Sequence, residues 1–289
     1  MTETLTRPHS PALDAILGHE HKALDHGFLR VVDYMGDEPA IVQAARVSYG
    51  TGTKAVQADR GLIRYLMRHR HSSPLEMCEI KLHVKLPIFV ARQWIRHRMA
   101  SVNEYSARYS ILDSEFYLPD PAHVCAQSAD NKQGRGDVLD PSLAREVSNL
   151  LWEDAMAVQT TYRTLIAEDG SYGLSRELAR IGLTLSTYTQ WYWKIDLHNL
   201  LHFLSLRLDH HAQYEIRVYA EIIMGIVRQW APNVVEAFED YRLHAHTFSR
   251  QEMQAIRDML ASLGAALPEK IEGVTKREMA AFRLALGVG

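Results

Sequence analysis

Residues 78–86 alternate strictly between apolar and polar side chains, which is the two-residue period of a β-strand. A strand of this kind buries one face only, as is typical of an antiparallel sheet. Because proline suits the first turn of a helix, Pro87 predicts a helix over residues 88–96 directly after this strand. The apolar face holds Cys78, Ile80, Leu82, Val84 and Leu86, and the other face holds Glu79, Lys81, His83 and Lys85.

The rest of the chain shows no regular alternation of strands and helices. Apolar and aromatic runs predict two further strands, over residues 28–35 and 184–193. We therefore expect the α+β class, with a mainly antiparallel or mixed sheet flanked by helices in one catalytic domain over residues 1–289. Helical spacing predicts helices over residues 39–49, 59–69, 142–167, 175–181, 198–206 and 211–230. We also expect a loose arm over about 1–12, a flexible excursion over 119–141 and a helical extension over about 245–289.

Composition narrows the class of protein. The chain has 289 residues, of which 47% are hydrophobic, and its formal net charge of -3 argues against a nucleic-acid-binding role. Two widely separated cysteines argue against a disulfide framework and for a reducing compartment. The sequence has no signal-peptide pattern and no run of about 18 apolar residues. We expect a cytoplasmic enzyme with no nucleic-acid or membrane partner.

Polar and charged side chains are unusually dense between Arg96 and Arg108. This stretch includes three arginines, a histidine, a carboxylate, an amide and several hydroxyls. The planar fork of arginine suits phosphate groups and the edges of pyrimidine rings. No glycine-rich phosphate loop is found, because the segment from Gly50 to Lys54 lacks the required spacing and is expected to be a turn. The stretch therefore predicts a phosphorylated ligand that is held by side chains.

The same stretch carries a family resemblance. Arg96-His97-Arg98, followed after seven residues by Ser106, resembles the signature of the flavin-dependent thymidylate synthases. Four fixed residues at fixed spacing are a specific pattern, and further segments match in the family's order. They are Gln93, Glu104 and Arg108 around the signature, His71 to Glu76 upstream, and Glu177 to Arg180 and Leu206 to Glu215 downstream.

The resemblance implies a fold, an activity and an assembly. Members of this family are homotetramers with a curved sheet flanked by helices, and each active site gathers residues from several subunits. They methylate deoxyuridine monophosphate (dUMP) to thymidylate (dTMP). Methylenetetrahydrofolate supplies the carbon, and NADPH reduces bound FAD, whose hydride reaches the pyrimidine.

The resemblance also implies which residues contact dUMP. Arg207 would stabilise the negative charge that develops on the pyrimidine ring, and Ser106 is the second residue assigned to catalysis, through binding and polarisation. Neither Cys78 on an apolar strand face nor Cys125 in a polar segment is a good nucleophile, which agrees with a mechanism without an active-site cysteine. The expected substrate-binding residues are Gln93, Arg96, Glu104, Tyr105, Ser106, Ala107, Arg108, Arg180 and Arg207.

FAD is the cofactor that the resemblance implies, and no metal is expected. Two cations beside a pyrophosphate and a flavin are chemically suitable. The family often has Asn-x-Arg followed by Asn four residues later. This chain departs from that pattern, because it has Asp196, His198 and His202 at these positions. The expected cofactor-binding residues are His71, Ser73, Arg96, His97, Arg98, Glu104, Asp196, His198 and His202.

Other interpretations remain open at this point. His198 and His202 lie four residues apart on a predicted helix, so a metal-dependent nucleotide phosphohydrolase is the alternative function. A non-catalytic nucleotide-binding or RNA-binding module is a third hypothesis, which the negative net charge disfavours. Arg207 could instead pair with Asp209 or Glu215, and Arg180 could be an ordinary surface arginine. The aromatic residues between 188 and 193 are more typical of a strand in the core than of a stacking platform.

Overall fold

The computed structural model describes residues 7–47, 59–112, 114–129, 134–167, 172–264 and 267–287. Two compact units form, Met1–Leu243 and His244–Gly289. The segment from Gly50 to Lys54 and the first half of the expected N-terminal arm lie outside the described residues. Further along the arm, Ser10 caps a short helix, α1 (Pro11–Asp14). The expectation of one catalytic domain over the whole chain stays a prediction.

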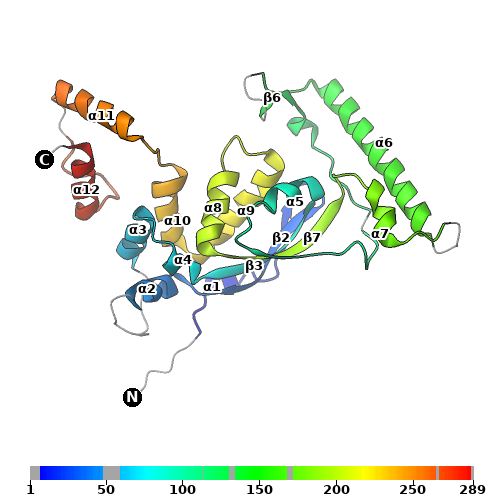
Figure 1. The fold of residues 1–289 in the computed structure, drawn as a ribbon, viewed down its shortest axis with the longest axis horizontal. Coiled ribbons are helices and arrows are strands. Elements are labelled where there is room, and N and C mark those ends of the chain that lie inside the picture. Colours follow the sequence, from blue (N-terminus) through cyan, green and yellow to red (C-terminus); the bar gives the residue numbers. More distant parts are fainter. Residues whose placement is uncertain are drawn as a thin grey trace, which may run out of the picture. The chain divides into compact units, whose positions relative to one another are not determined.

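A five-stranded antiparallel sheet organises the first unit (Figure 1). Strand β3 (Glu79–Pro87) lies at its centre and pairs along its whole length with β7 (Tyr188–Asp196). The predicted alternation is confirmed, because Ile80, Leu82 and Val84 are at most 1% exposed. The order of the strands is β1 (His21–Ala23), β2 (Gly27–Met35), β3, β7 and β4 (Ser101–Glu104).

Three helices cover one face of this sheet, in agreement with the predicted α+β class. They are α5 (Ile88–Trp94), α8 (Leu197–Arg207) and α9 (Tyr214–Trp230). Trp94 is fully buried among Trp191, Trp193, Phe203 and Tyr219, with ring centroids 4.8 to 5.9 Å away. Aromatic residues of β7 therefore belong to the core, as expected, although Tyr192 faces outward.

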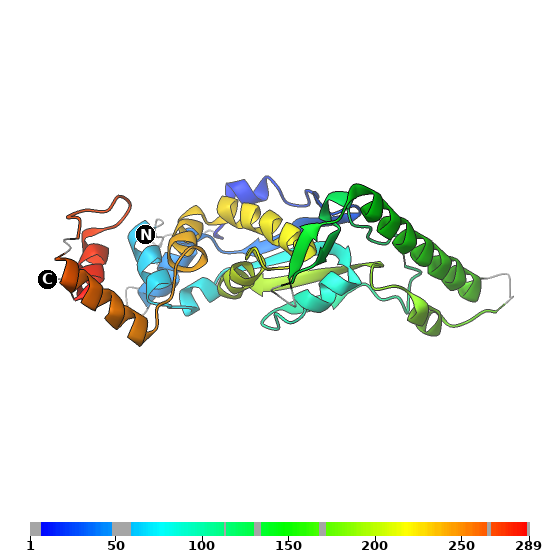
Figure 2. The ribbon, with the colours of Figure 1, turned by 90° about the horizontal axis from the view of Figure 1, so that it is seen from above.

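The remaining helices of the first unit follow the apolar periodicity that predicted them, with ends shifted by one to three residues where both ends are described. Proline at the first turn and Asp140 as cap explain the sharp start of the longest one, α6. Both views show α6 as a single long rod (Figures 1 and 2). These helices are α2 (Glu38–Val47), α3 (Arg60–Arg68), α6 (Pro141–Ile166) and α7 (Arg176–Ala179), with the 3-10 turn η2 (Arg180–Gly182) after α7. The one-turn helix α4 (Ser73–Glu76) was not predicted.

Several elements were not predicted. The excursion over residues 119–141 was expected to be flexible, yet it holds the turn η1 (Pro121–His123) and a hairpin of β5 (Cys125–Gln127) and β6 (Arg135–Val138). The segment Met99–Asn103 was expected to be a turn, yet most of it belongs to β4. These strands are short and largely exposed, so they carry no apolar period. Helix α10 (Pro232–Phe238) and the π-helical turn η3 (Glu239–Leu243) were also missed.

Helix α10 is held by a residue from the other end of the unit. The buried Glu38 carboxylate accepts hydrogen bonds from the backbone N–H groups of Asn233 at 2.5 Å and Val234 at 3.1 Å, and from the Asn233 side chain at 2.6 Å. A carboxylate there satisfies first-turn N–H groups that have no partner within the helix.

The second unit contains the two helices predicted within residues 250–289. They are α11 (Arg250–Leu263) and α12 (Lys276–Leu286). Each begins with a capping box, Ser249 with Glu252 and Thr275 with Glu278, and each ends at a glycine in the left-handed conformation. Within the described parts of the chain, no helix combines the length and the apolar character needed to cross a bilayer.

Candidate active site

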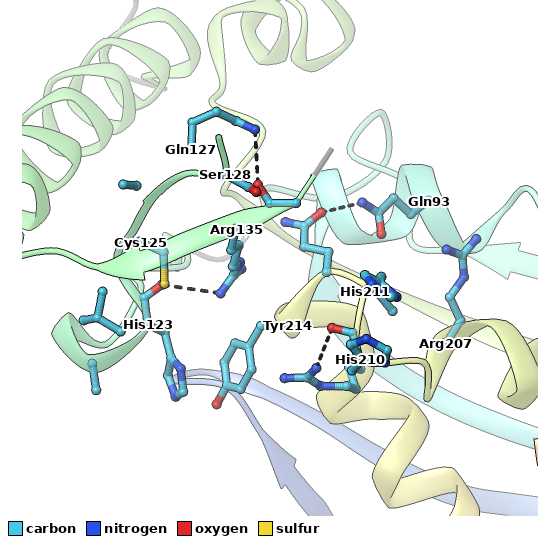
Figure 3. A pocket seen from close by; sticks show the side chains of 17 residues that line it. Gln93, His123, Cys125, Gln127, Ser128, Arg135, Arg207, His210, His211 and Tyr214 are labelled. Atoms are coloured by element: carbon cyan, nitrogen blue, oxygen red, sulfur yellow. Dashed lines mark hydrogen bonds between the residues drawn. The ribbon is translucent and has the colours of Figure 1, made fainter. Parts of the chain in front are cut away.

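The larger of two cavities that carry predicted site residues has a volume of about 900 Å³ and is called the Arg207 cavity (Figure 3). Gln93 from α5 and Arg207 from the end of α8 line one part of it. Residues 210–214 and Arg217, which lead into and begin α9, line the middle. The β5–β6 hairpin and His123 line the remainder, so three separate stretches of sequence build this cavity.

Arg207 has no carboxylate partner among the described residues. Asp209 instead accepts from His211, and both oxygens of Glu215 lie 2.5–2.6 Å from Arg135. The interpretation of Arg207 as the partner of Asp209 or Glu215 is therefore wrong. Half-burial lowers the pKa of Arg207, but a guanidinium still remains charged at neutral pH. The cavity thus contains a cation that no carboxylate of the described residues neutralises.

His97 fixes the position of this cation. Arg207 Nε donates a hydrogen bond to His97 Nε2 at 3.1 Å, so the imidazole must be the acceptor and hence neutral. Burial, then Arg207 and then His202, lowers the pKa of His97 from 6.5 to about 4. The His97 ring also packs against Phe203 and lies 6.1 Å from the His202 ring. Because His97 stays neutral, it orients Arg207 without offsetting its charge.

This arrangement predicts a specific pH dependence of stability. The folded chain holds His97 neutral down to about pH 4, whereas the unfolded chain protonates it below 6.5. The free energy of unfolding should therefore fall as pH drops from 6.5 to 4, and His97→Asn should remove about 1–2 kcal/mol of that fall after allowance for solvent screening. Urea titrations at several pH values measure this. The exposed His246→Asn is the matched control, and equal slopes for wild type and His97→Asn would contradict the prediction.

Gln93 and Arg96 do not form one wall within this chain. Gln93 lines the Arg207 cavity, and its Nε2 donates to Gln213 Oε1 beside the start of α9. Arg96 lies after the end of α5, is exposed and lines neither of the two cavities. Helix α5, which was predicted to reach residue 96, ends at Trp94, two residues before Arg96.

A second cavity of about 450 Å³, called the Ser106 cavity, gathers the other expected substrate residues. Strand β4 and the turn that follows it build one side, where Tyr105 N donates to Gln190 O at 2.8 Å. Glu104 accepts from Thr189 Oγ1 at 2.8 Å, and Arg108 lies nearby in an exposed ion pair with Glu177 at 3.1 Å. The predicted residues that line this cavity are Glu104, Tyr105, Ser106, Ala107 and Arg180.

The two cavities share no lining residue. The expected substrate-binding residues are therefore divided between two places on one chain, with Gln93 and Arg207 in one and Ser106 with Arg180 in the other.

Some of the expected cofactor residues lie on α8 or pack against it. Helix α4, which starts at Ser73, packs against α8, which carries His198 and His202. Arg96 and Arg98 are exposed and have no side-chain partner among the described residues. Two unpartnered guanidinium groups suit a pyrophosphate, so this surface fits a dinucleotide cofactor. His71, Ser73 and His202 are likewise exposed.

Asp196 has a local structural role that its sequence context did not reveal. It caps α8, where its carboxylate accepts from Asn199 N at 2.9 Å and from Asn199 Nδ2 at 2.7 Å. The acidic residue that departs from the family pattern is therefore explained by a helix cap. Its predicted contact with the cofactor stays a prediction.

Neither cysteine has the features of an activated nucleophile. Cys78 is buried just before β3, and burial raises the pKa of its thiol to about 12. Cys125 is half-buried on the hairpin and lines the Arg207 cavity, a position that was not predicted. The polar side chains available for chemistry in the cavity are therefore arginine and histidine, and not a thiol.

The alternative metal site is not supported. Among the described residues, the one group of three ligand-bearing side chains is Asp209, His210 and His211, which is exposed. His198 and His202 belong to no such group. Two histidines without a third ligand do not make a catalytic metal centre.

Sequence reasoning missed a buried polar network behind the Arg207 cavity. Glu215 is 4% exposed, pairs with Arg135 and accepts from Tyr117 Oη at 3.1 Å. The ring of Tyr214 stacks on His123 with centroids 3.8 Å apart. This network attaches the hairpin to the start of α9, and Figure 2 shows the two side by side. The glycines at 134 and 136 indicated a turn but not its partner.

Fold and site together define an α+β protein with arginine-lined cavities that suit a phosphorylated ligand. Comparisons with known proteins agree. The model of the family described as "Thymidylate synthase complementing protein" matches residues 30–233. The chain is 62% identical over 273 residues to the flavin-dependent thymidylate synthase of Gluconobacter oxydans (94% of this chain, 89% of the relative). It is 58% identical over 286 residues to that of Ruegeria pomeroyi (99% and 94%).

A solved structure is also similar. It is the UMP/dUMP methylase PolB from Streptomyces cacaoi bound with 5-Br UMP, which is 33% identical, with a TM-score of 0.68 over 77% of this chain and 96% of that one. The chain belongs to the flavin-dependent thymidylate synthase family. The family and fold class predicted from the motifs are thereby confirmed, and with them the enzyme class, a methyltransferase that uses a flavin.

Proposed function

We propose that this chain carries out the reductive methylation of dUMP to dTMP, with methylenetetrahydrofolate as carbon donor, FAD as the flavin and NADPH as its reductant. The observation that carries the proposal is Arg207, a half-buried cation without a carboxylate partner, held by a neutral His97 in a cavity that also presents Gln93. Anionic, planar ligands suit such a site.

Arg207 would act on the pyrimidine itself. The ring must become electron-rich before C5 can form a bond to the electrophilic one-carbon unit, and this activation places negative charge on the ring and its carbonyl oxygens. A guanidinium that is already in place stabilises that charge without any rearrangement of the site. Such electrostatic stabilisation is usually the largest contribution to the rate enhancement of an enzyme. Gln93, whose amide is already oriented by Gln213, would hold the polar edge of the ring. No thiol addition to the ring is needed in this scheme.

Residues of the Ser106 cavity would bind the same nucleotide. Arg180 and Arg108 offer guanidinium groups for the phosphate, and Arg108 would exchange its exposed partner Glu177 for that phosphate. Surface ion pairs contribute little to stability, so this exchange costs little. Ser106 would polarise the ring by hydrogen bonding.

Arg96 and Arg98 would hold the FAD, with His71, Ser73, His198 and His202 around it. When bound, the flavin supplies the hydride that turns the transferred carbon into a methyl group. The arginines would neutralise the pyrophosphate, and a cation near the flavin favours its reduced anionic form. Glu104 and Asp196 are the remaining expected contacts.

A homotetramer with shared active sites is part of the proposal. Helix α6 carries a series of apolar side chains that are each at least 41% exposed, and large exposed apolar patches mark contact surfaces. Contact through such a surface would let a Ser106 half-site of one copy meet an Arg207 half-site of another. The apolar residues are Leu143, Leu150, Leu151, Trp152 and Met156.

Shared sites predict that two inactive variants restore each other. Arg207→Ala and Arg108→Ala damage different half-sites, so a hybrid of the two chains contains some sites with both arginines intact. We expect each variant alone to be nearly inactive and the co-expressed, doubly tagged hybrid to regain a clear fraction of wild-type turnover. A hybrid of two differently tagged Arg207→Ala chains is the control. A hybrid no more active than its parents would contradict shared sites.

The function itself is tested by growth. Expression of this chain should relieve the thymidine requirement of a strain that lacks thymidylate synthase. The purified protein should be yellow, and its flavin absorbance should bleach when NADPH and dUMP are added. A colourless protein that fails to restore growth would contradict the proposal.

A further inference from the structure

The proposed chemistry uses only one end of the Arg207 cavity. Gln93 and Arg207 lie together at that end, while His123 and the hairpin lie at the other (Figure 3). A cavity of about 900 Å³ is near the upper end of small-molecule sites, which span about 300–1,000 Å³. It therefore has room for a second ligand beside a nucleoside monophosphate.

The charged side chains on the described wall of the cavity are all basic. Among the described residues that line it, none carries a carboxylate. Six carry a guanidinium or an imidazole. They are Arg135, Arg207, Arg217, His123, His210 and His211. Arg207 and Arg217, which Glu215 does not engage, attract anions to this wall.

Arg217 is the available arginine beside the hairpin end, because its guanidinium lies 6.0 Å from the centroid of the Tyr214 ring, which stacks on His123. Arg135 is engaged by both oxygens of Glu215. Arg217 donates through Nη1 to His210 O at 3.2 Å, and its Nε lies 3.6 Å from Glu221 in a surface pair. A guanidinium has five N–H donors, so Arg217 retains donors for a ligand.

The start of α9 adds to the attraction for anions. Gln213 is the N-cap, but its side chain accepts from Gln93 and makes no capping hydrogen bond. The first turn of this 17-residue helix therefore has no side-chain cap, and Ala212, Gln213 and Tyr214 line the cavity. The positive end of the helix dipole supplements the charge of Arg217.

We propose that the hairpin end of the Arg207 cavity, called the hairpin subsite, binds the anionic end of a co-substrate through Arg217. The chemical class is a ligand with several phosphates or carboxylates. Both a nicotinamide dinucleotide phosphate and the glutamate tail of a folate have this chemistry. The inference rests on the proposed function, because it places a second reactant beside dUMP.

Steady-state kinetics with Arg217→Gln distinguish the two sources. The control is Arg228→Gln, on the same helix, where the exposed arginine pairs with Glu239. We expect the KM for one co-substrate to rise about tenfold, as for the loss of one charged hydrogen bond, with the KM for dUMP unchanged. If the KM rises for NADPH but not for NADH, Arg217 binds the 2′-phosphate of the dinucleotide. If the variant instead loses a preference for triglutamyl over monoglutamyl folate, Arg217 binds the carboxylates of the folate tail. A rise for dUMP alone, or no rise, overturns the proposal.

A binding measurement tests the subsite independently of turnover. Tripolyphosphate is titrated by calorimetry into the flavin-loaded protein saturated with dUMP. Wild type, Arg217→Lys and Arg228→Gln should bind it, and Arg217→Gln should bind it about tenfold more weakly. Equal binding by Arg217→Gln overturns the subsite. If Arg217→Gln binds tripolyphosphate more weakly but the wild-type chain does not restore growth, the subsite is supported. Only the proposed function is then contradicted.

Discussion

Arg207→Ala is expected to lower kcat/KM for dUMP methylation by about 10²–10³-fold while the flavin stays bound. Arg207 lies in its cavity without a carboxylate partner, and its contact with His97 is neutral. Removing it therefore deletes the cation that would stabilise charge on the pyrimidine. The loss should be in kcat as well as KM, because the interaction strengthens as charge develops.

Two further variants sharpen this test. Arg207→Lys keeps a charge but loses the planar fork, so its activity should lie between those of wild type and Arg207→Ala. Arg228→Ala breaks only a surface pair with Glu239 and should behave as wild type. Flavin absorbance per protein separates a catalytic defect from loss of cofactor. An Arg207→Ala enzyme that keeps most of its activity would remove Arg207 from the mechanism.

Trp94→Ala should lower the free energy of unfolding by about 3–5 kcal/mol. Trp94 is fully buried where α5 meets the sheet, and its ring contacts the rings of Trp193 and Phe203 at 5.1 and 4.8 Å. Truncation would leave a large cavity directly beneath Gln93. The measurement is the midpoint of urea denaturation, compared between variants whose unfolding free energy has the same slope against urea concentration.

Trp94→Phe is the matched control for that cavity. The indole Nε1 of Trp94 is buried and has no hydrogen-bond partner among the described residues. Phenylalanine removes this unpaired donor and keeps most of the packing, so its cost should be well below that of alanine. Equal losses for the two variants would contradict a packing role for the ring.

The fold was predictable where a period is long and one face is buried. Alternation over residues 78–86 predicted β3, and the proline after it predicted α5. The short strands β4, β5 and β6 have exposed side chains, so no apolar period reveals them. Helix α10 depends on Glu38, which lies 195 residues earlier, and such a partner cannot be read from local sequence.

The candidate site was predictable as a set of residues but not as an arrangement. The motif spacing identified Arg207 and Ser106, and the resemblance implied active sites built from several subunits, but the two separate cavities that these residues line follow only from the structure. Asp196 appeared to be a departure at the cofactor and is a helix cap in the structure. Arg135 on the hairpin and Glu215 on α9 make a part-buried pair, and only the three-dimensional fold brings them together.

The full-length pairing of β3 with β7 has a consequence for how the chain folds during synthesis. Pro87 pairs with Tyr188, and Glu79 with Asp196, so the centre of the sheet cannot close until a long intervening segment has been made. Glu38 must wait still longer, until Asn233 has emerged. Contacts so distant in sequence are slow to form, and early strands stay unpaired meanwhile. Nascent chains stalled before residue 188 should therefore be protease-sensitive throughout the sheet, and those released beyond residue 243 should become resistant in one step.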